Sequence, residues 1–266
     1  MSDDIIQSRQ NPRVQGVAKL RDRAVREARG RFLIEGYREL SRALERKVVL
    51  EELYFCPTLY KDAQASVLVE QARERGVSIC ELGESAFDKV SGREGPDGLL
   101  GVAETWDVAL SRLNLGPNPL VLIAEAVEKP GNLGSLLRTA DSAGVAALVI
   151  CDPVTDLFNP NVIRASQGAA FAVPVAVAST AETIAWARAQ GLRMLATTPE
   201  GAQPLWDVDA RGPVALIMGS EKDGLAPAWL AAADARVFIP QAGLSDSLNV
   251  ATAAAVCLFE AVRQRR

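Results

Sequence analysis

The sequence predicts an α/β protein, and three observations lead to this fold class. The chain has 266 residues, enough for one large or two medium domains with ample core. Short apolar runs alternate with segments of helical periodicity along nearly its whole length. Residues 113–119, rich in turn formers, interrupt that alternation and predict a boundary between two domains.

The first 106 residues are expected to form a small α/β domain. Residues 5–30 are polar, basic and helical in part. Regular elements are expected to end at Gly30, Gly36, Pro57 and Gly76, because glycine and proline interrupt helices and strands. Strands are expected at 31–36, 48–56, 77–82 and 99–105, and helices at 37–46, 62–75 and 84–90, with a loop at 91–98.

A linker at 107–118 leads to the second expected domain, 119–266. Its strands are near-continuously apolar, which is typical of a mostly parallel sheet covered by helices on both faces. In such sheets, ligands bind beyond the carboxyl ends of the strands. Strands are expected at 120–124, 147–151, 192–197, 214–218 and 235–239, and helices at 133–143, 160–167, 180–190, 227–232 and 248–263.

The composition excludes several classes of protein. The chain contains no histidine, so no mechanism that needs a histidine base, triad or metal ligand applies. The acidic start, Met1 to Asp4, has no apolar core behind it, and no apolar run approaches a membrane span. We expect a cytoplasmic protein without a metal, in which four scattered cysteines are reduced core residues: Cys56, Cys80, Cys151 and Cys257.

The charge is distributed unevenly along the chain. Residues 9–47 hold twelve basic and five acidic residues, a net charge of +7, so the rest of a chain of net charge −4 carries −11. A basic segment on an acidic protein is the footprint of a partner with a phosphate backbone. A solvated basic helix is the plainer alternative. The residues expected to contact RNA are Arg9, Arg13, Lys19, Arg21, Arg23 and Arg31.

Three polar stretches follow strands of the second half. The first, 128–140, contains Asn132 at an expected helix cap and Arg138 further along; its glycines give G-x-x-G, so the dinucleotide fingerprint is not met. The second, 218–225, places Glu221 just after a strand. In the third, 239–250, Ser247 and Asn249 stand where a loop, Gly243 to Asp246, meets a helix, and either is also a plausible N-cap. Ends of parallel strands can converge on one pocket, so we expect the three stretches to meet.

The three stretches together resemble the three motifs of the SpoU (TrmH) family of RNA ribose 2′-O-methyltransferases. The matching residues are Asn132…Arg138-Thr139-Ala140, then Met218-Gly219-Ser220-Glu221-Lys222-Asp223-Gly224-Leu225, then Ile239-Pro240…Ser247-Leu248-Asn249-Val250. Phe32-Leu33-Ile34-Glu35-Gly36 resembles the substrate-binding domain often fused in front of that family, which is similar to kink-turn-binding ribosomal proteins. The resemblance implies a C-terminal SPOUT domain with a trefoil knot, a fold that pattern reasoning would not propose.

The family binds S-adenosylmethionine in the knot and works as a homodimer. By matching position, the polar active site would comprise Asn132, Arg138, Glu221, Ser247 and Asn249. The cofactor would lie against Gly219, Ile239 and Leu248, to which we add Met218 and Thr197. The chain departs from the family pattern at Lys129, where Asp is common, at Gln241, where Met is common, and at Ala251, where Ser is common.

The implied chemistry is in-line displacement at a sulfonium methyl, with removal of a proton from a weakly acidic hydroxyl. A guanidinium is a poor base. We therefore expect Arg138 to grip the RNA phosphate and orient the hydroxyl, with the proton leaving to that phosphate or to water; Glu221 is the other candidate base. We expect Arg138→Ala to abolish transfer while leaving cofactor affinity nearly intact.

The basic front half favours a large folded RNA as substrate. Family members with such a front domain more often resemble ribosomal RNA methyltransferases, so the resemblance implies 23S ribosomal RNA, in either a housekeeping or an antibiotic-resistance role. Transfer RNA is an alternative substrate. A second class of function is a non-catalytic RNA-binding factor in ribosome assembly, which intact polar motifs disfavour. A nucleotide-cofactor oxidoreductase is a third class, disfavoured by the missing fingerprint.

Overall fold

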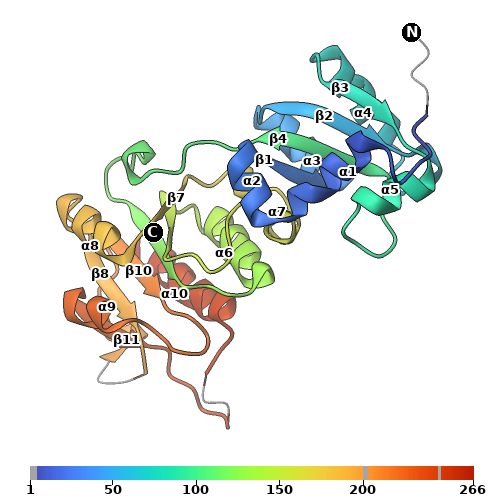
Figure 1. Ribbon diagram of the computed structural model, residues 1–266. Helices are drawn as coiled ribbons and strands as arrows, with labels where there is room; N and C mark the ends of the chain where they lie inside the picture. The colour runs from blue at the N-terminus through green and yellow to red at the C-terminus, as the bar shows by residue number, and fades with distance from the viewer. Residues whose placement is uncertain (1–4, 200–202, 245–246) are drawn as a thin grey trace. The chain divides into compact units, whose positions relative to one another are not determined.

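The computed structural model describes residues 5–199, 203–244 and 247–266, and it divides into two compact units. Unit 1 comprises residues 1–106 and 156–171, and unit 2 comprises 107–155 and 172–266. Figure 1 shows the elements of both units along the chain. Residues 156–171, from within the second half of the sequence, thus pack with the first half.

Unit 1 is built on a four-stranded sheet with strand order β1-β4-β2-β3. The inner strand β4 is antiparallel to both β1 and β2, and β3 is parallel to β2. The strands are β1 Arg31–Glu35, β2 Leu50–Phe55, β3 Ser78–Glu81 and β4 Leu99–Glu104. The helices are α1 Pro12–Ala18, α2 Arg23–Arg29, α3 Tyr37–Glu45, α4 Ala65–Glu74, α5 Glu84–Val90 and α7 Pro160–Ser166, with short 3-10 turns at Lys19–Arg21, Pro57–Leu59 and Ala169–Phe171.

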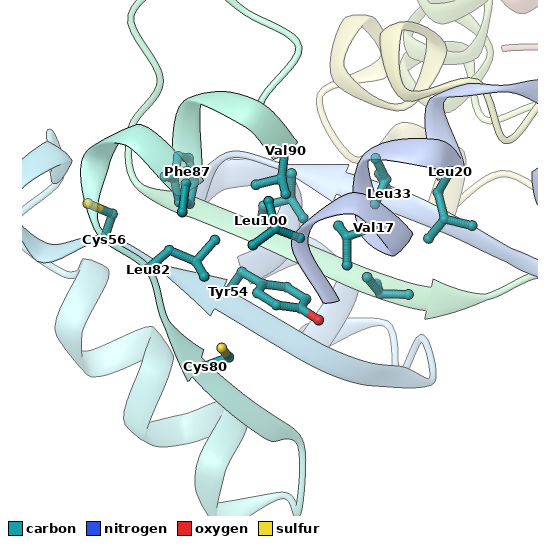
Figure 2. Close-up of a cluster of buried hydrophobic side chains, with 13 residues drawn as sticks. Val17, Leu20, Leu33, Tyr54, Cys56, Cys80, Leu82, Phe87, Val90 and Leu100 are labelled. Carbon is teal, nitrogen blue, oxygen red and sulfur yellow. The ribbon is translucent and has the colours of Figure 1, made fainter. Parts of the chain in front are cut away.

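The two faces of β1 bury different clusters, because successive side chains of a strand point to opposite faces. Leu33 lies in the core that α1 and α5 cover, together with Tyr54 and Leu100 (Figure 2). On the other face, the Phe32 ring lies 5.7 Å from that of Trp106 and 5.1 Å from that of Phe158. Residues 156–171 therefore supply part of this second cluster.

A buried ion pair also fixes residues 156–171 to unit 1. Arg26 Nη2 donates to Asp156 Oδ2 at 2.6 Å, and the Arg26 side chain is only 2% exposed. Arg26 Nη1 donates to the carbonyls of Leu20 and Arg21, so the charge is both paired and solvated by the backbone.

Unit 2 is a seven-stranded sheet of order β7-β6-β5-β10-β8-β11-β9 in which every pairing is parallel. The strands are β5 Leu120–Glu125, β6 Ala147–Cys151, β7 Val175–Ala178, β8 Arg193–Thr197, β9 Gln203–Pro204, β10 Val214–Met218 and β11 Ala235–Phe238. The helices are α6 Pro130–Ala143, α8 Thr180–Ala189, α9 Pro227–Ala232 and α10 Val250–Gln264, with 3-10 turns at Leu110–Arg112 and Leu205–Asp207.

The helices of unit 2 form two pairs. α8 packs against α9, and Ala187 and Trp229 from these helices join one buried cluster with Val121 and Ile217 of the sheet. α6 packs against α10, and α10 contacts β10 (Figure 1). Leu110, Leu113 and Leu115 pack against the α8–α9 cluster, so the expected linker segment is folded onto unit 2.

The expected elements correspond closely to those observed, and β6, β10, α5 and α9 have the expected bounds. Two short strands, β7 and β9, were not expected. The expected start of α6 is wrong, and so is the cap position of Asn132: the helix begins at Pro130, with Lys129 as its N-cap residue. Proline is well suited to the first helical position, because the N–H it lacks would be unpaired there.

The four cysteines are free and buried, which confirms their expected place in the core. Within the described ranges, no helix is long and apolar enough to cross a membrane.

Candidate active site

The three polar stretches leave the sheet of unit 2 at one edge. Met218, the last residue of β10, is aligned with Ala124 near the end of β5. Stretches 128–140, 218–225 and 239–250 therefore follow the carboxyl ends of β5, β10 and β11, where parallel sheets bind ligands. The contacts at that edge confirm that the three stretches meet.

The meeting point is the carboxylate of Glu221. Its Oε1 accepts hydrogen bonds from Asn132 Nδ2 at 2.7 Å and from Asn249 Nδ2 at 2.8 Å. Its Oε2 accepts from Lys129 Nζ, also at 2.7 Å. One side chain from each stretch, together with Lys129, thus forms a single polar cluster at the surface of unit 2.

The cap of α10 fixes the orientation of Asn249. Its Oδ1 accepts from the backbone N–H groups of Ala251 and Thr252, so Asn249 is the N-cap of this helix. Because Oδ1 accepts these capping hydrogen bonds, Nδ2 points to Glu221, and it also donates to Asn132 Oδ1 at 3.1 Å. Asn249 is therefore both the N-cap of α10 and a member of the cluster.

Lys129 is the member of the cluster that sequence reasoning missed. It was noted only as a departure from the family pattern, although its position three residues before Asn132 could have placed it at the same helix terminus. Hydrogen bonding from Lys129 is the main cause that lowers the pKa of Glu221, and Asn132 and Asn249 act in the same direction. In return, Glu221 raises the pKa of Lys129. The cluster therefore stabilises an ionised carboxylate.

The turn that carries Glu221 requires glycine at its start. A Cβ on Gly219 would overlap the backbone of Gly224 and lie 2.6 Å from the nitrogen of Leu225. Ser220 and Gly224 exchange backbone hydrogen bonds at 3.0 and 3.2 Å, which closes the turn. Gly219 thus permits the backbone to fold back on itself directly after β10.

Arg138 lies beyond the first turn of α6 and is exposed. It does not share the hydrogen bonds around Glu221 that the structure gives. It lines an open groove of about 510 Å³ between α6 and α10, which Asn249 also lines. Phe259 of α10, 48% exposed, lies in the same groove. Ser247 is exposed, and Ser245 and Asp246 of the expected loop lie outside the described residues.

The residues expected to hold the cofactor surround the same edge. Thr197, at the end of β8, donates its hydroxyl to the carbonyl of Ile217 at 2.7 Å and lies beside Met218 Sδ at 3.5 Å. Met218 is buried, Ile239 is half-buried, and Leu248 is 37% exposed. Leu244, which sequence reasoning did not select, is fully exposed. Apolar side chains beside a tight glycine turn fit the apolar face and the backbone contacts that a nucleoside needs.

Most of the basic residues selected in unit 1 are paired within the unit. Arg31 donates to Glu51, Arg21 to Glu35, Arg23 to Glu27, and Arg13 to Glu52 and Tyr54. Arg9 and Lys19 are exposed, and neither has an ion pair with a residue that the structure describes. Sequence reasoning did not select Arg38 and Arg42, one turn apart on α3, which line an open pocket of about 680 Å³ together with Tyr37 and Lys61. The same pocket is also lined by Arg93 and by four acids: Glu39, Glu45, Asp62 and Asp97.

No group of three or more acidic or cysteine side chains able to hold a metal ion occurs in the described part of the chain.

Comparison with known proteins assigns both parts of the chain. Residues 119–259 match the model of the SpoU rRNA Methylase family, and residues 11–101 match that of the MRM3-like substrate binding domain. The chain is 31% identical to the 23S rRNA (guanosine(2553)-2′-O)-methyltransferase RlmP of Bacillus subtilis, over 96% of its own length and 97% of that protein's.

Two further relatives come from other bacteria. The chain is 32% identical to the 23S rRNA (uridine(2479)-2′-O)-methyltransferase of Streptomyces viridochromogenes, over 93% of its own length and 88% of that protein's. Its fold matches the crystal structure of the AdoMet-bound rRNA methyltransferase from Sinorhizobium meliloti with a TM-score of 0.88 and 31% identity, over 97% of each chain.

Proposed function

The chain belongs to the SpoU rRNA methylase family, and we propose that it transfers the methyl group of S-adenosylmethionine to a ribose 2′-hydroxyl of 23S ribosomal RNA. The observation that carries this proposal is the cluster of Glu221 with Asn132 and Asn249, which joins the three family motifs at one edge of the sheet. The relatives that share nearly the whole chain carry the names of 23S rRNA 2′-O-methyltransferases, which favours ribosomal over transfer RNA.

The chain is an enzyme that depends on S-adenosylmethionine, as are its AdoMet-bound structural relatives. When bound, this cofactor supplies an electrophilic methyl group on a sulfonium. We assign Gly219, Ile239 and Leu248, with Met218 and Thr197, to holding it. Their support is the tight turn at Gly219 and the apolar side chains at the carboxyl ends of β8, β10 and β11.

Arg138 is assigned to the RNA phosphate and to orienting the reacting hydroxyl. Its support is an exposed guanidinium on the wall of a groove that Asn249 also lines. Arginine is suited to phosphate because its fork of donors matches the phosphate oxygens. Glu221 is a weak candidate for the base, because its neighbours lower its pKa and it already accepts three hydrogen bonds. The proton then leaves to the phosphate or to water.

Unit 1 is assigned to gripping the RNA away from the methylated nucleotide. Arg9 and Lys19 remain candidates for this role, while Arg13, Arg21, Arg23 and Arg31 are occupied by acidic partners. Arg38 and Arg42 on α3 are further candidates, because both are exposed, and the half-buried ring of Tyr37 beside them adds a surface on which a base can stack.

A homodimer and a trefoil knot are part of the proposal. The groove between α6 and α10, with its exposed Phe259, is suited to a second copy that would bury the ring beside Arg138. The knot rests on the family to which residues 119–259 belong. We place the enzyme in the cytoplasm, where bacterial ribosomal RNA is made.

The test is transfer of labelled methyl from S-adenosylmethionine to RNA from cells that lack this gene, followed by separation of the RNA classes. The proposal expects label in 23S ribosomal RNA with the wild type. Label in transfer RNA would keep the enzyme and overturn the substrate. Cofactor binding without label in any RNA or intact subunit would replace the enzyme by a binding factor.

A further inference from the structure

Lys129 belongs to the polar cluster around Glu221, although the family commonly has an acid at this position. It is the residue before α6, and its carbonyl accepts from the backbone of Asn132 at 3.0 Å and of Leu133 at 3.2 Å. Pro130 at the first helical position fixes the backbone at this point. The direction in which the Lys129 side chain leaves the helix terminus is therefore set by local geometry.

The two oxygens of Glu221 are divided between different partners. Oε1 accepts from the amides of Asn132 and Asn249, and Oε2 accepts from Lys129 Nζ at 2.7 Å. If Oε2 were free, the carboxyl group could rotate or move toward solvent, and Oε1 would no longer be held between the two amides. Lys129 thus restrains a side chain that contacts both of the other motifs.

The ion pair is too exposed to serve mainly as a folding contact. The Lys129 side chain is 70% exposed and that of Glu221 is 30% exposed. Pairs of this kind contribute little to the stability of a fold. In contrast, Lys129 contacts the same carboxylate that accepts hydrogen bonds from both asparagines of the cluster.

We propose that Lys129 is a positioning residue of the methyl-transfer site, which holds Glu221 Oε2 so that Oε1 orients Asn132 and Asn249. This inference rests on the proposed function. Glu221 then acts as a fixed, ionised acceptor and not as a proton carrier. The carboxylate that contacts the other two family motifs in this chain is thus held by a cation at a position where the family commonly has an acid.

Among the residues that the structure describes, the following charged groups lie near this carboxylate. From the segment before α6 come Lys129 and Glu128, and Glu128 also favours the charged form of Lys129. On the Glu221 turn itself, Lys222 and Asp223 follow, and the N-cap of α10 contributes the neutral amide of Asn249. Lys129 is the first cause that lowers the pKa of Glu221, so removing Lys129 lets that pKa rise.

The test compares Lys129→Met, Lys129→Arg and Lys129→Asp with wild type, at saturating S-adenosylmethionine and RNA across a range of pH. Lys129→Met is expected to reduce the rate about tenfold even where Glu221 is ionised, because Oε2 is no longer held, and the deficit is expected to grow as pH falls and Glu221 becomes protonated. Lys129→Asp should move the acidic limb further to higher pH, and Lys129→Arg should restore most of the rate.

Lys222→Met is the matched control, because it removes an exposed positive charge one residue along the turn, and no described residue forms an ion pair with Lys222. Carbon NMR of the Glu221 carboxyl group gives a readout that does not depend on activity. Its titration should move to higher pH in Lys129→Met, with the thermal unfolding midpoint unchanged.

Two outcomes would overturn the proposal. One is a Lys129→Met enzyme with the rate, pH profile and Glu221 titration of wild type. The other is a loss of rate that is equal at every pH and accompanied by a lower unfolding midpoint, which would make Lys129 structural. A wild type that transfers no methyl to any RNA would instead refute the proposed function, and the NMR titration would still test Lys129.

Discussion

Asn249 donates its side-chain amide to the side-chain oxygen of Asn132 at 3.1 Å, although 117 residues separate them in the chain. Both amides also donate to the same oxygen of Glu221. The start of α6 and the start of α10 are therefore held against the turn after β10. These contacts join the three motifs in one polar cluster.

The two roles of Asn249 can be separated by substitution. Asn249→Asp keeps an oxygen that caps α10 but places a second carboxylate beside Glu221, so we expect a stable protein with little methyl transfer. Asn249→Ala loses the cap as well, and unfolding in urea should show a loss of about 1 kcal/mol. Equal activity in Asn249→Asp and wild type would show that the amide is not needed.

Gly219 is expected to tolerate no side chain. Gly219→Ala forces a methyl group into the backbone of Gly224, and we expect a loss of stability of about 1–3 kcal/mol together with weaker binding of S-adenosylmethionine. Gly16→Ala in α1 is the control: its Cβ would have no neighbour closer than 3.9 Å, and a helical glycine gains from alanine. Calorimetric titration and thermal unfolding compare the two, and a Gly219→Ala protein that binds cofactor normally would refute the close-turn argument.

Arg138→Ala is expected to abolish methyl transfer and leave the affinity for S-adenosylmethionine nearly intact. The reason is that Arg138 lines the groove between α6 and α10 and shares none of the described hydrogen bonds around Glu221. Arg138→Lys keeps the charge without the planar fork, so it should recover only part of the activity. Simultaneous loss of transfer and of cofactor binding in Arg138→Ala would assign Arg138 a structural role instead.

Residues 156–171 should be essential to unit 1. Asp156→Ala leaves the buried guanidinium of Arg26 without its acid, which we expect to lower the free energy of unfolding by about 3 kcal/mol. Glu27→Ala removes the carboxylate of the exposed pair with Arg23 and should change the free energy of unfolding by less than about 0.5 kcal/mol. Denaturant unfolding measures both, and equal effects would contradict the importance of burial.

The thiols should be unreactive in the folded protein. Burial raises the pKa of both Cys151 and Cys257 to about 12, above the usual range, so both stay protonated at pH 8. A thiol reagent at pH 8 is expected to modify these two only after denaturation, and the buried Cys56 and Cys80 only slowly before it. Rapid labelling of Cys151 in native protein would show that its strand opens.

Much of the fold could be predicted because local patterns decide it. Apolar strands such as β6 and β10 are flanked by residues that end regular elements, so their bounds follow from the sequence. β7 could not be found in this way, since Val175–Ala178 is a short run of small apolar residues whose pairing with β6 decides its structure. The packing of residues 156–171 with unit 1 depends on Phe158 and Asp156 finding distant partners, which no local pattern encodes.

The residues of the candidate site could be predicted from the sequence better than the hydrogen bonds between them. Asn132, Glu221 and Asn249 followed from their places after strands and from the family resemblance. Their shared hydrogen bonds, and the part that Lys129 takes in them, depend on how three loops meet. For the basic residues, charge counting could not distinguish Arg31, which is paired with Glu51, from Arg42, which lines an open pocket.

The measurement that tests the central claim most directly is nucleoside mass spectrometry of 23S ribosomal RNA, taken from cells lacking the gene and then incubated with the protein and S-adenosylmethionine. The account predicts one additional 2′-O-methylated nucleoside, absent with Arg138→Ala. A methyl group on a base, or no new methyl group in RNA that the protein binds together with the cofactor, would contradict it.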